Sequence, residues 1–426
     1  MNAGGARTED LRRALEALRN GVPNRDAVRF LGCGQTKVGP RFHDQLAKVE
    51  PLLDEGRQAE GMLVAGEFGT GKSHLLQYLQ HIALDQNFIC SRVVISKETP
   101  LYEPGKVYEA AVGSAVIPGA SGQVFQEVSP KLRQDPPRYA EFFRWAGSEA
   151  SGISPLFPAT LLLKERLSGD PELSEQISGF WAGEKLPVAR VRVGLRQLGQ
   201  AAAFSVRAVP LKQLALQRFR FAPRLFRAAG YKGWVILIDE VELIGRYSLL
   251  QRAKSYAELA RWLGLVAEEQ YAGLTVVAAI TGTFAEAVLH DKGDWDLVAP
   301  RLRDKGTEEF NALAARAETG MQVIEKRIPL VEPDDAVLHR TYATLKELHR
   351  DAYGWAPPDV SWGEQLTTRA MRSYVRRWIN EWDLKRLCPD AELHTEEEAL
   401  TSDFTESPEL EQPPEDPASG EREAGE

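Results

Sequence analysis

Eight consecutive residues, GEFGTGKS, have types and spacing that suit phosphate binding. They match the P-loop pattern G-x-x-x-x-G-K-[ST] at every constrained position. In such a loop the backbone N–H groups surround phosphate oxygens, and the N-terminus of the following helix adds positive potential. The residues that we expect to bind the phosphates of ATP are Gly66, Glu67, Phe68, Gly69, Thr70, Gly71, Lys72, Ser73 and His74.

The last two positions of this pattern have separate expected roles. The ammonium group of Lys72 would reach the β- and γ-phosphates and assist catalysis, and the hydroxyl of Ser73 would ligate Mg²⁺. The apolar run 62–65 predicts a buried strand before the loop, and leucines at helical spacing predict a helix over 73–86. This context favours a P-loop over the alternative, an ordinary glycine-rich turn before a helix.

An acidic pair follows a second apolar run. Residues 234–238 read WVILI and lead directly into Asp239 and Glu240, the pattern of a Walker B strand. Because ligands of open α/β sheets gather at the carboxyl ends of strands, we expect both side chains near the P-loop. Asp239 would hold Mg²⁺ through water, and Glu240 would act as general base on the attacking water. Glu242 is a second candidate for the base, and the alternative is a pair that only caps the strand.

Two further positions could contact phosphate oxygens near the reacting bond. Thr281 follows the apolar run 274–280 and could bind the γ-phosphate or the attacking water, although Thr–Gly–Thr is also common at strand ends. Arg301 and Arg303 lie before the last predicted strand, and guanidinium groups suit the charge that develops during phosphoryl transfer. They could act as an arginine finger for a neighbouring subunit, or lie in a solvated basic turn.

Basic residues gather at two other places. Arg369, Arg372 and Arg376 share one face of a predicted helix, where they could contact nucleotide phosphates, DNA phosphates or solvent. Residues 185–232 contain eleven Lys and Arg and no Asp or Glu, with four phenylalanines between them. This composition suits contact with DNA phosphates. Docking against a partner subunit or the acidic tail is the alternative.

The order of the segments predicts an α/β protein of the P-loop NTPase (AAA+-like) type. Its parallel sheet, covered by helices on both faces, would contain strands at 62–65, 88–95, 234–238, 274–280 and 325–330. The stretch 97–231 is too long for a simple crossover and predicts a mostly helical, basic insertion. The expected regions are a helical N-terminal lead-in (1–44), the ATPase domain (45–331), an all-helical C-terminal lid (332–388) and a disordered acidic tail (389–426).

Composition and charge narrow the class of protein. No apolar run among the 426 residues approaches the roughly 20 residues of a membrane helix, so we expect no membrane partner. The three cysteines lack metal-ligand spacing and no secretory signal begins the sequence, which favours a cytoplasmic location.

Residues 390–426 hold 14 acidic residues and one arginine; since the net charge is −9, the preceding chain carries +4. The tail could aid solubility or act as a DNA-mimicking inhibitory arm.

Several stretches together resemble an AAA+ ATPase, and more specifically the ATP-binding proteins (BrxC/BrxD type) of BREX bacteriophage-exclusion systems. They are LRNGVPNRDAVRFLGCGQ (18–35), GEFGTGKSHLLQYLQHIAL (66–84), VVISKETPLYEPGKVY (93–108), VILIDEVELI (235–244) and TRAMRSYVRRWINEWDLKRL (368–387). The resemblance implies a cytoplasmic protein that acts with other subunits of a phage-defence system. It also implies ATP and Mg²⁺ as cofactors and DNA or DNA-bound partners as the object. The family's nucleotide-site residues correspond to Lys72, Ser73, Asp239 and Glu240.

Two classes of function remain open. In the first, the protein oligomerises, hydrolyses ATP at subunit interfaces and acts on DNA. In the second it is a STAND-like switch that binds ATP and assembles partners with little turnover. The presence of Glu240 favours the first class, because a pure ATP binder needs no general base. The size, the basic stretch and the helical C-terminal region disfavour a third class, a P-loop kinase or small-substrate transferase.

Overall fold

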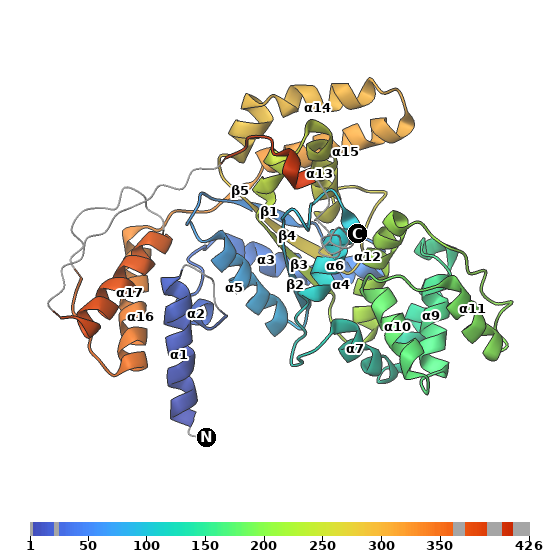
Figure 1. Cartoon of the computed structure of the whole chain (residues 1–426), viewed down its shortest axis with the longest axis horizontal. Coiled ribbons are helices and arrows are strands. Elements are labelled where there is room, and N and C mark those ends of the chain that lie inside the picture. Colours follow the sequence, from blue (N-terminus) through green and yellow to red (C-terminus); the bar gives the residue numbers. More distant parts are fainter. Residues whose placement is uncertain (1–2, 21–24, 361–370, 390–402, 412–426) are drawn as a thin grey trace, which may run out of the picture.

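A computed structural model of the chain describes residues 3–20, 25–360, 371–389 and 403–411 (Figure 1). A parallel sheet of five strands lies at its centre, in the order β2-β3-β4-β1-β5. The strands are β1 (Met62–Ala65), β2 (Ile89–Val94), β3 (Trp234–Asp239), β4 (Leu274–Ile280) and β5 (Ile328–Pro329). Because all neighbours are parallel, the carboxyl ends of the five strands share one edge.

The strands are apolar throughout because both faces of the sheet are covered. Alternate residues point to opposite faces. On one face they contact a cluster that includes α3 (Val38–Ala47), α4 (Val49–Asp54) and α5 (Lys72–Asp85). On the other face they contact a larger cluster that includes α6 (Pro104–Gly113), α12 (Leu211–Ala228) and α13 (Leu249–Trp262). The predicted parallel sheet with helices on both faces is therefore confirmed.

The fifth strand is shorter than predicted. The sequence pattern suggested a strand over 325–330, but α15 (Glu308–Glu325) continues to Glu325 and only Ile328–Pro329 pair with β1. Proline has no N–H to donate to a neighbouring strand, which suits an edge strand and limits its length.

The long segment between β2 and β3 is mostly helical, as predicted, and shares the larger apolar cluster with the sheet. After α6 it contains α7 (Val124–Val128), η1 (Ser129–Arg133), α8 (Pro136–Ala146), η2 (Glu149–Ser151), α9 (Leu156–Arg166), α10 (Pro171–Ala182) and α11 (Val188–Gln197), and it ends with α12. Asp135 and Asp170, each followed by proline, accept backbone hydrogen bonds at the starts of α8 and α10. These Asp–Pro pairs show why the two helices begin where they do.

Two short helical segments follow strands of the sheet, and the second leads to a helical pair beyond it. Segment η3 (Val241–Arg246) follows β3, and η4 (Ala285–Asp291) lies soon after β4. Beyond η4, α14 (Asp294–Arg303) and α15 form the pair shown at the top of Figure 1. Helix α15 lies against α13 at Gly320, where a Cβ atom would overlap the backbone carbonyl of Tyr256. Only glycine permits this close approach.

The N-terminal and C-terminal helices lie together, whereas the sequence predicts them as separate regions. Helices α1 (Ala3–Arg19), α2 (Arg25–Leu31), α16 (Asp335–Tyr353) and α17 (Met371–Leu387) share a third apolar cluster. Leu15 of α1, Leu345 of α16 and Trp382 of α17 are all buried in it. Figure 1 shows this bundle beside α5, the helix that follows the P-loop.

The acidic tail departs from the prediction of disorder over residues 403–411. This segment includes the short turn η5 (Pro408–Glu411) and lies against the body of the protein. Two apolar residues, Phe404 and Leu410, interrupt its acidic sequence and contact the main apolar cluster. Elsewhere, no helix in the described ranges has the length and apolar character needed to cross a membrane.

Candidate nucleotide-binding site

The predicted P-loop lies between β1 and α5, at the carboxyl edge of the sheet. Gly69 and Gly71 have φ values of +80° and +98°, in the left-handed region that side chains disfavour. A Cβ atom on Gly66 would lie 2.5 Å from Oγ1 of Thr70, and that hydroxyl donates a 2.8 Å hydrogen bond to the carbonyl of Glu67. The positive φ values and the close contact explain why glycine occupies these three positions. They also make the loop compact before the helix.

Lys72 is 8% exposed and is held inside the loop. Its Nζ donates to the carbonyl of Gly66 at 2.8 Å and lies 3.6 Å from Oε1 of Glu242. The same Nζ is 5.1 Å from the centre of the Phe68 ring. Burial raises the pKa of Glu242, while the positive charge of Lys72 opposes that rise. A carboxylate of η3 therefore occupies the neighbourhood of the ammonium group that is expected to bind phosphate.

The acidic pair lies where the sequence predicts, at the end of β3. Asp239 is 5% exposed, and its Oδ2 is 3.7 Å from Nη2 of Arg92 on the neighbouring strand β2. Glu240 has an exposed side chain and a left-handed backbone, with φ of +58°. Such a backbone is uncommon outside glycine and occurs at functional turns. Partial desolvation by the surrounding protein and the charge of Asp239 raise the pKa of Glu240, and Lys72 opposes the rise.

Thr281 directly follows β4, the strand between β1 and β3. Its side chain is fully buried, and Oγ1 has no hydrogen-bond partner among the described residues. A buried hydroxyl without a partner is costly, so Thr281 is a candidate for contact with a ligand or with water. The neighbouring β1 lies in register with β4, since Ala65 pairs with Ile280, which places Thr281 beside the first residue of the P-loop.

A cavity of about 230 Å³ opens beside the P-loop. Gly69, Gly71, Ser73 and His74 line one side of it, and residues 31–36 and 331–341 line the other. Nε2 of His74 lies 2.6 Å from the carbonyl oxygen of Gly32, which joins the two walls. Burial lowers the pKa of His74, so the neutral ring is favoured. The second wall was not among the predicted site residues.

The predicted arginine stripe reaches the cavity at one position. Arg372 lines its rim, and its backbone N–H donates to the carbonyl of Gly69 at 3.4 Å. The side chains of Arg372 and Arg376 are exposed on α17. Arg369 lies outside the described residues. The contact with Gly69 brings the C-terminal helix onto the P-loop.

Arg301 and Arg303 lie apart from this cavity. Both are exposed on the last turn of α14, and neither lines the cavity. Arg303 forms an ion pair of 2.6 Å with Glu318 of α15.

The basic stretch 185–232 does not form a single surface. Arg218 is buried and donates to the carbonyls of Phe180 and Glu184. Three other arginines of the stretch form ion pairs or a cation–π contact within the protein. Three of the four interleaved phenylalanines lie in the core, each with 0% exposure: Phe219, Phe221 and Phe226. They cannot stack on nucleic-acid bases.

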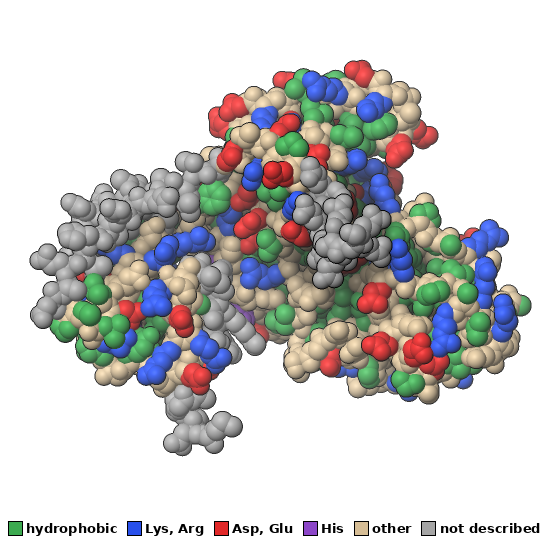
Figure 2. Space-filling model, viewed as in Figure 1, with side chains coloured by type: hydrophobic (Ala, Val, Ile, Leu, Met, Phe, Trp, Pro, Cys, Tyr) green, Lys and Arg blue, Asp and Glu red, His purple; other side chains and the backbone are tan. Residues whose placement is uncertain are grey.

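A smaller basic surface remains at the outer end of the insertion. Arg192, Arg196 and Arg207 are exposed around a concave region that Phe204 also lines. Figure 2 shows Lys and Arg side chains along the outer edge of the lobe that carries α11. These three arginines are exposed members of the basic stretch, and we call them the outer arginine cluster.

The residues present fit a nucleotide with Mg²⁺. No group of three or more His, Cys, Asp or Glu side chains in the described part of the chain could hold a metal ion by itself. Mg²⁺ in nucleotide sites takes only one or two protein ligands, along with phosphates and water. Ser73 and Asp239 are the predicted pair of such ligands, and the buried hydroxyl of Thr281 is a further polar group without a partner among the described residues.

Comparison with known families agrees with this site. The family model described as BREX system ATP-binding protein BrxC/D matches residues 7–121 and 203–324, which together form more than half of the chain. The matched parts contain the P-loop, the acidic pair and Thr281, while the gap covers α7 to α11. The match ends before the stretch 368–387. No curated protein matches the chain. The chain belongs to the family of BREX system ATP-binding proteins BrxC/D.

Proposed function

We propose that this protein is an AAA+-like ATPase that binds Mg²⁺–ATP at the P-loop and hydrolyses it. The observation that carries this proposal is the convergence of Lys72, Asp239, Glu240 and Thr281 on the P-loop edge of the parallel sheet, beside a cavity. The family's description as an ATP-binding protein of a phage-defence system supports ATP as the ligand. A helical C-terminal segment over the P-loop supports the AAA+-like assignment.

Each residue has a distinct part in this reaction. The loop N–H groups and Lys72 would hold the phosphates, and Thr281 would donate its buried hydroxyl to the γ-phosphate or to the attacking water. Glu240 would accept a proton from that water, since its exposed side chain can turn toward the phosphate side of the strand edge. Ser73 and Asp239 would hold Mg²⁺, which when bound neutralises charge on the phosphate oxygens.

Oligomerisation would complete the site. Arg301 and Arg303 are exposed and lie away from their own cavity, so we propose that one of them acts on ATP bound by a neighbouring copy. The charge that develops during phosphoryl transfer would then be stabilised only in the assembly. We further propose that Arg372 acts on the nucleotide of its own subunit, because it lines the cavity rim.

We propose DNA as the partner of the outer arginine cluster. Arg196 and Arg207 form no ion pair with any described residue, so their charge is free for phosphate groups. The protein would act on DNA in the cytoplasm together with other subunits of the defence system.

A STAND-like switch with little turnover is the second candidate. The contact between Lys72 and Glu242 favours it, because a carboxylate that competes with ATP for the phosphate-binding ammonium would keep turnover low. The two candidates differ in whether turnover occurs at all.

The test is ATP hydrolysis by the purified protein with and without double-stranded DNA, while light scattering follows its mass. Turnover that rises with DNA, accompanies ATP-dependent assembly and disappears in Glu240→Gln is expected for the ATPase. ATP binding with no turnover and no DNA association would instead support the switch.

A further inference from the structure

The docked tail segment, residues 403–411, occupies a groove on the side of the protein that carries the ends of β3 and β4. Phe404 packs against Phe284 of the η4 region, with ring centres 5.6 Å apart at nearly right angles. A Cβ atom on Gly245 would lie 2.7 Å from the Phe404 ring, so glycine is needed to seat the aromatic side chain. The groove is thus shaped for an aromatic anchor.

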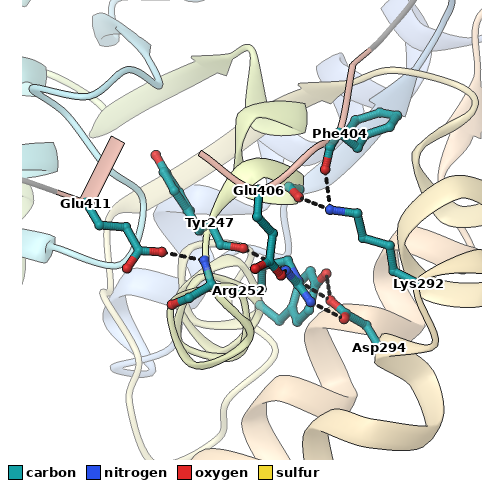
Figure 3. A network of polar contacts seen from close by, with 10 residues as sticks. Tyr247, Arg252, Lys292, Asp294, Phe404, Glu406 and Glu411 are labelled. Carbon is teal, nitrogen blue, oxygen red and sulfur yellow. Dashed lines mark hydrogen bonds and ion pairs between the residues drawn. The ribbon is translucent and has the colours of Figure 1, made fainter. Parts of the chain in front are cut away.

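Polar contacts hold the rest of the segment in an extended, peptide-like manner (Figure 3). Arg252 binds Glu406 at 2.6 Å, and the backbone N–H of Ser407 donates to the carbonyl of Arg246 at 2.9 Å. Lys292 donates to the carbonyl of Phe404, and Glu411 accepts from the N–H of Ser248. The residues that contact the tail in this way, together called the tail groove, are Gly245, Arg246, Ser248, Arg252, Phe284 and Lys292.

Contacts within the body of the protein hold the cationic residues of the tail groove in place. Arg252 forms a two-point contact with the buried carboxylate of Asp294, with both distances 2.7 Å, and Tyr256 donates to the same carboxylate at 2.6 Å. Lys292 also donates to the carbonyl of Gly245 at 2.9 Å. These contacts within the body hold two cations toward the groove. An acidic segment satisfies them, and the Arg252 contact lowers the pKa of Glu406 so that it stays charged.

One short segment, η3, contributes residues both to the tail groove and to the nucleotide site. Segment η3 begins directly after Glu240, and it carries both Glu242, which lies 3.6 Å from Lys72, and Gly245, which contacts Phe404. ATP phosphates and Glu242 compete for the same ammonium group. Releasing Lys72 requires Glu242 to move, and a docked tail holds η3 at Gly245 and Arg246.

We propose that the tail groove recognises acidic peptides with an aromatic anchor, and that residues 403–411 of the same chain occupy it and hold Glu242 against Lys72. Docking and ATP binding then oppose one another, and each weakens the other by the same factor. This inference rests on the proposed role of Lys72 in phosphate binding.

The test compares two variants of the full-length protein. Phe404→Ala/Glu406→Ala removes the aromatic anchor and the main ion pair of the tail. Glu409→Ala is the matched control, because Glu409 is exposed in the same segment and has no side-chain contact with a described residue. Hydrogen exchange at the Ser407 amide reports docking, and titration with a fluorescent ATP analogue reports nucleotide affinity.

We expect the double variant to lose protection at Ser407 and to bind the analogue about fivefold more tightly or better, a typical coupling between two sites. The control should match the natural protein in both measurements. A labelled peptide of residues 401–413 should bind the double variant and not the natural protein, because only the variant has a free groove.

Three results would overturn the inference. Equal exchange at Ser407 in both variants would show that the segment does not dock through these contacts. Lost protection with unchanged nucleotide affinity would remove the coupling. Protection at Ser407 that depends on protein concentration would show that a second copy, not the same chain, supplies the tail. If no variant binds the analogue while the peptide result holds, the ATP assignment fails and the groove stands alone as a peptide site.

Discussion

Replacing Thr281 with valine separates a catalytic role from a structural one. The Thr281 hydroxyl is fully buried and has no partner among the described residues, so its removal breaks no hydrogen bond within the described protein. An unpaired buried hydroxyl costs about 1–3 kcal/mol, and valine removes it with little change of shape. We therefore expect Thr281→Val to be more stable without nucleotide, by about 1 kcal/mol if a water molecule partly satisfies the natural hydroxyl.

Thermal unfolding without nucleotide measures this gain. One kcal/mol shifts the midpoint by about 2–4 °C for domains of 150–250 residues, so a rise of a few degrees is expected. The matched control is Thr283→Val, because Thr283 is two residues away with an exposed side chain. Its midpoint should stay within about 1 °C of the natural protein, since surface substitutions have small effects.

The same variant should lose activity. A hydrogen bond to a charged group contributes about 1.5–3 kcal/mol, which corresponds to a fall of about ten- to a hundredfold in ATP turnover. Thr283→Val should keep its turnover. A lower unfolding midpoint in Thr281→Val would mean that the hydroxyl has a structural partner, and unchanged turnover would mean that it does not contact the reacting phosphate. Either result would refute the reasoning.

Three further predictions concern the body of the protein. Gly320→Ala should destabilise it by about 2 kcal/mol or more in denaturant unfolding, because a Cβ atom there overlaps the α13 backbone, whereas Gly113→Ala, in open space, should change stability by less than about 1 kcal/mol. Burial lowers the pKa of Lys164 to about 8. Folding therefore favours the neutral amine, and stability relative to Lys164→Met should rise by about 1 kcal/mol between pH 8 and 9.5; a difference that is flat with pH would contradict this. Arg196→Ala/Arg207→Ala should weaken binding to double-stranded DNA and reduce its salt dependence by about 2 in slope, and an unchanged slope would exclude the outer arginine cluster as the DNA contact.

The sheet and the centre of the site could be predicted from the sequence because their signals are local. Strands β1 and β4 have the predicted bounds, and β3 extends one residue further, to Asp239. Continuous apolar runs identify buried strands, and parallel pairing then brings the residues after them to one edge. Those two rules are sufficient to predict that the P-loop and the acidic pair lie at the same edge of the sheet.

Other features depend on contacts between distant segments. Residues 31–36 form the far wall of the cavity because α2 contacts α5, and no local pattern reveals that pairing. Charge counts along 185–232 could not show that Arg218 is buried while Arg196 is exposed. The prediction of a disordered tail rests on the acidic composition of the whole stretch. It does not take account of one aromatic residue, Phe404, which packs against the body of the protein.

The most direct test of ATP hydrolysis at this site compares Glu240→Gln with Glu242→Gln in steady-state turnover. Both substitutions replace a carboxylate with an amide of the same shape, and the two residues lie on either side of Val241. We expect Glu240→Gln to bind ATP but lose turnover by about a hundredfold or more, the contribution of a general base. Glu242→Gln should retain turnover and bind ATP more tightly. Natural rates in Glu240→Gln, or loss of turnover only in Glu242→Gln, would contradict the assignment of Glu240 as the base.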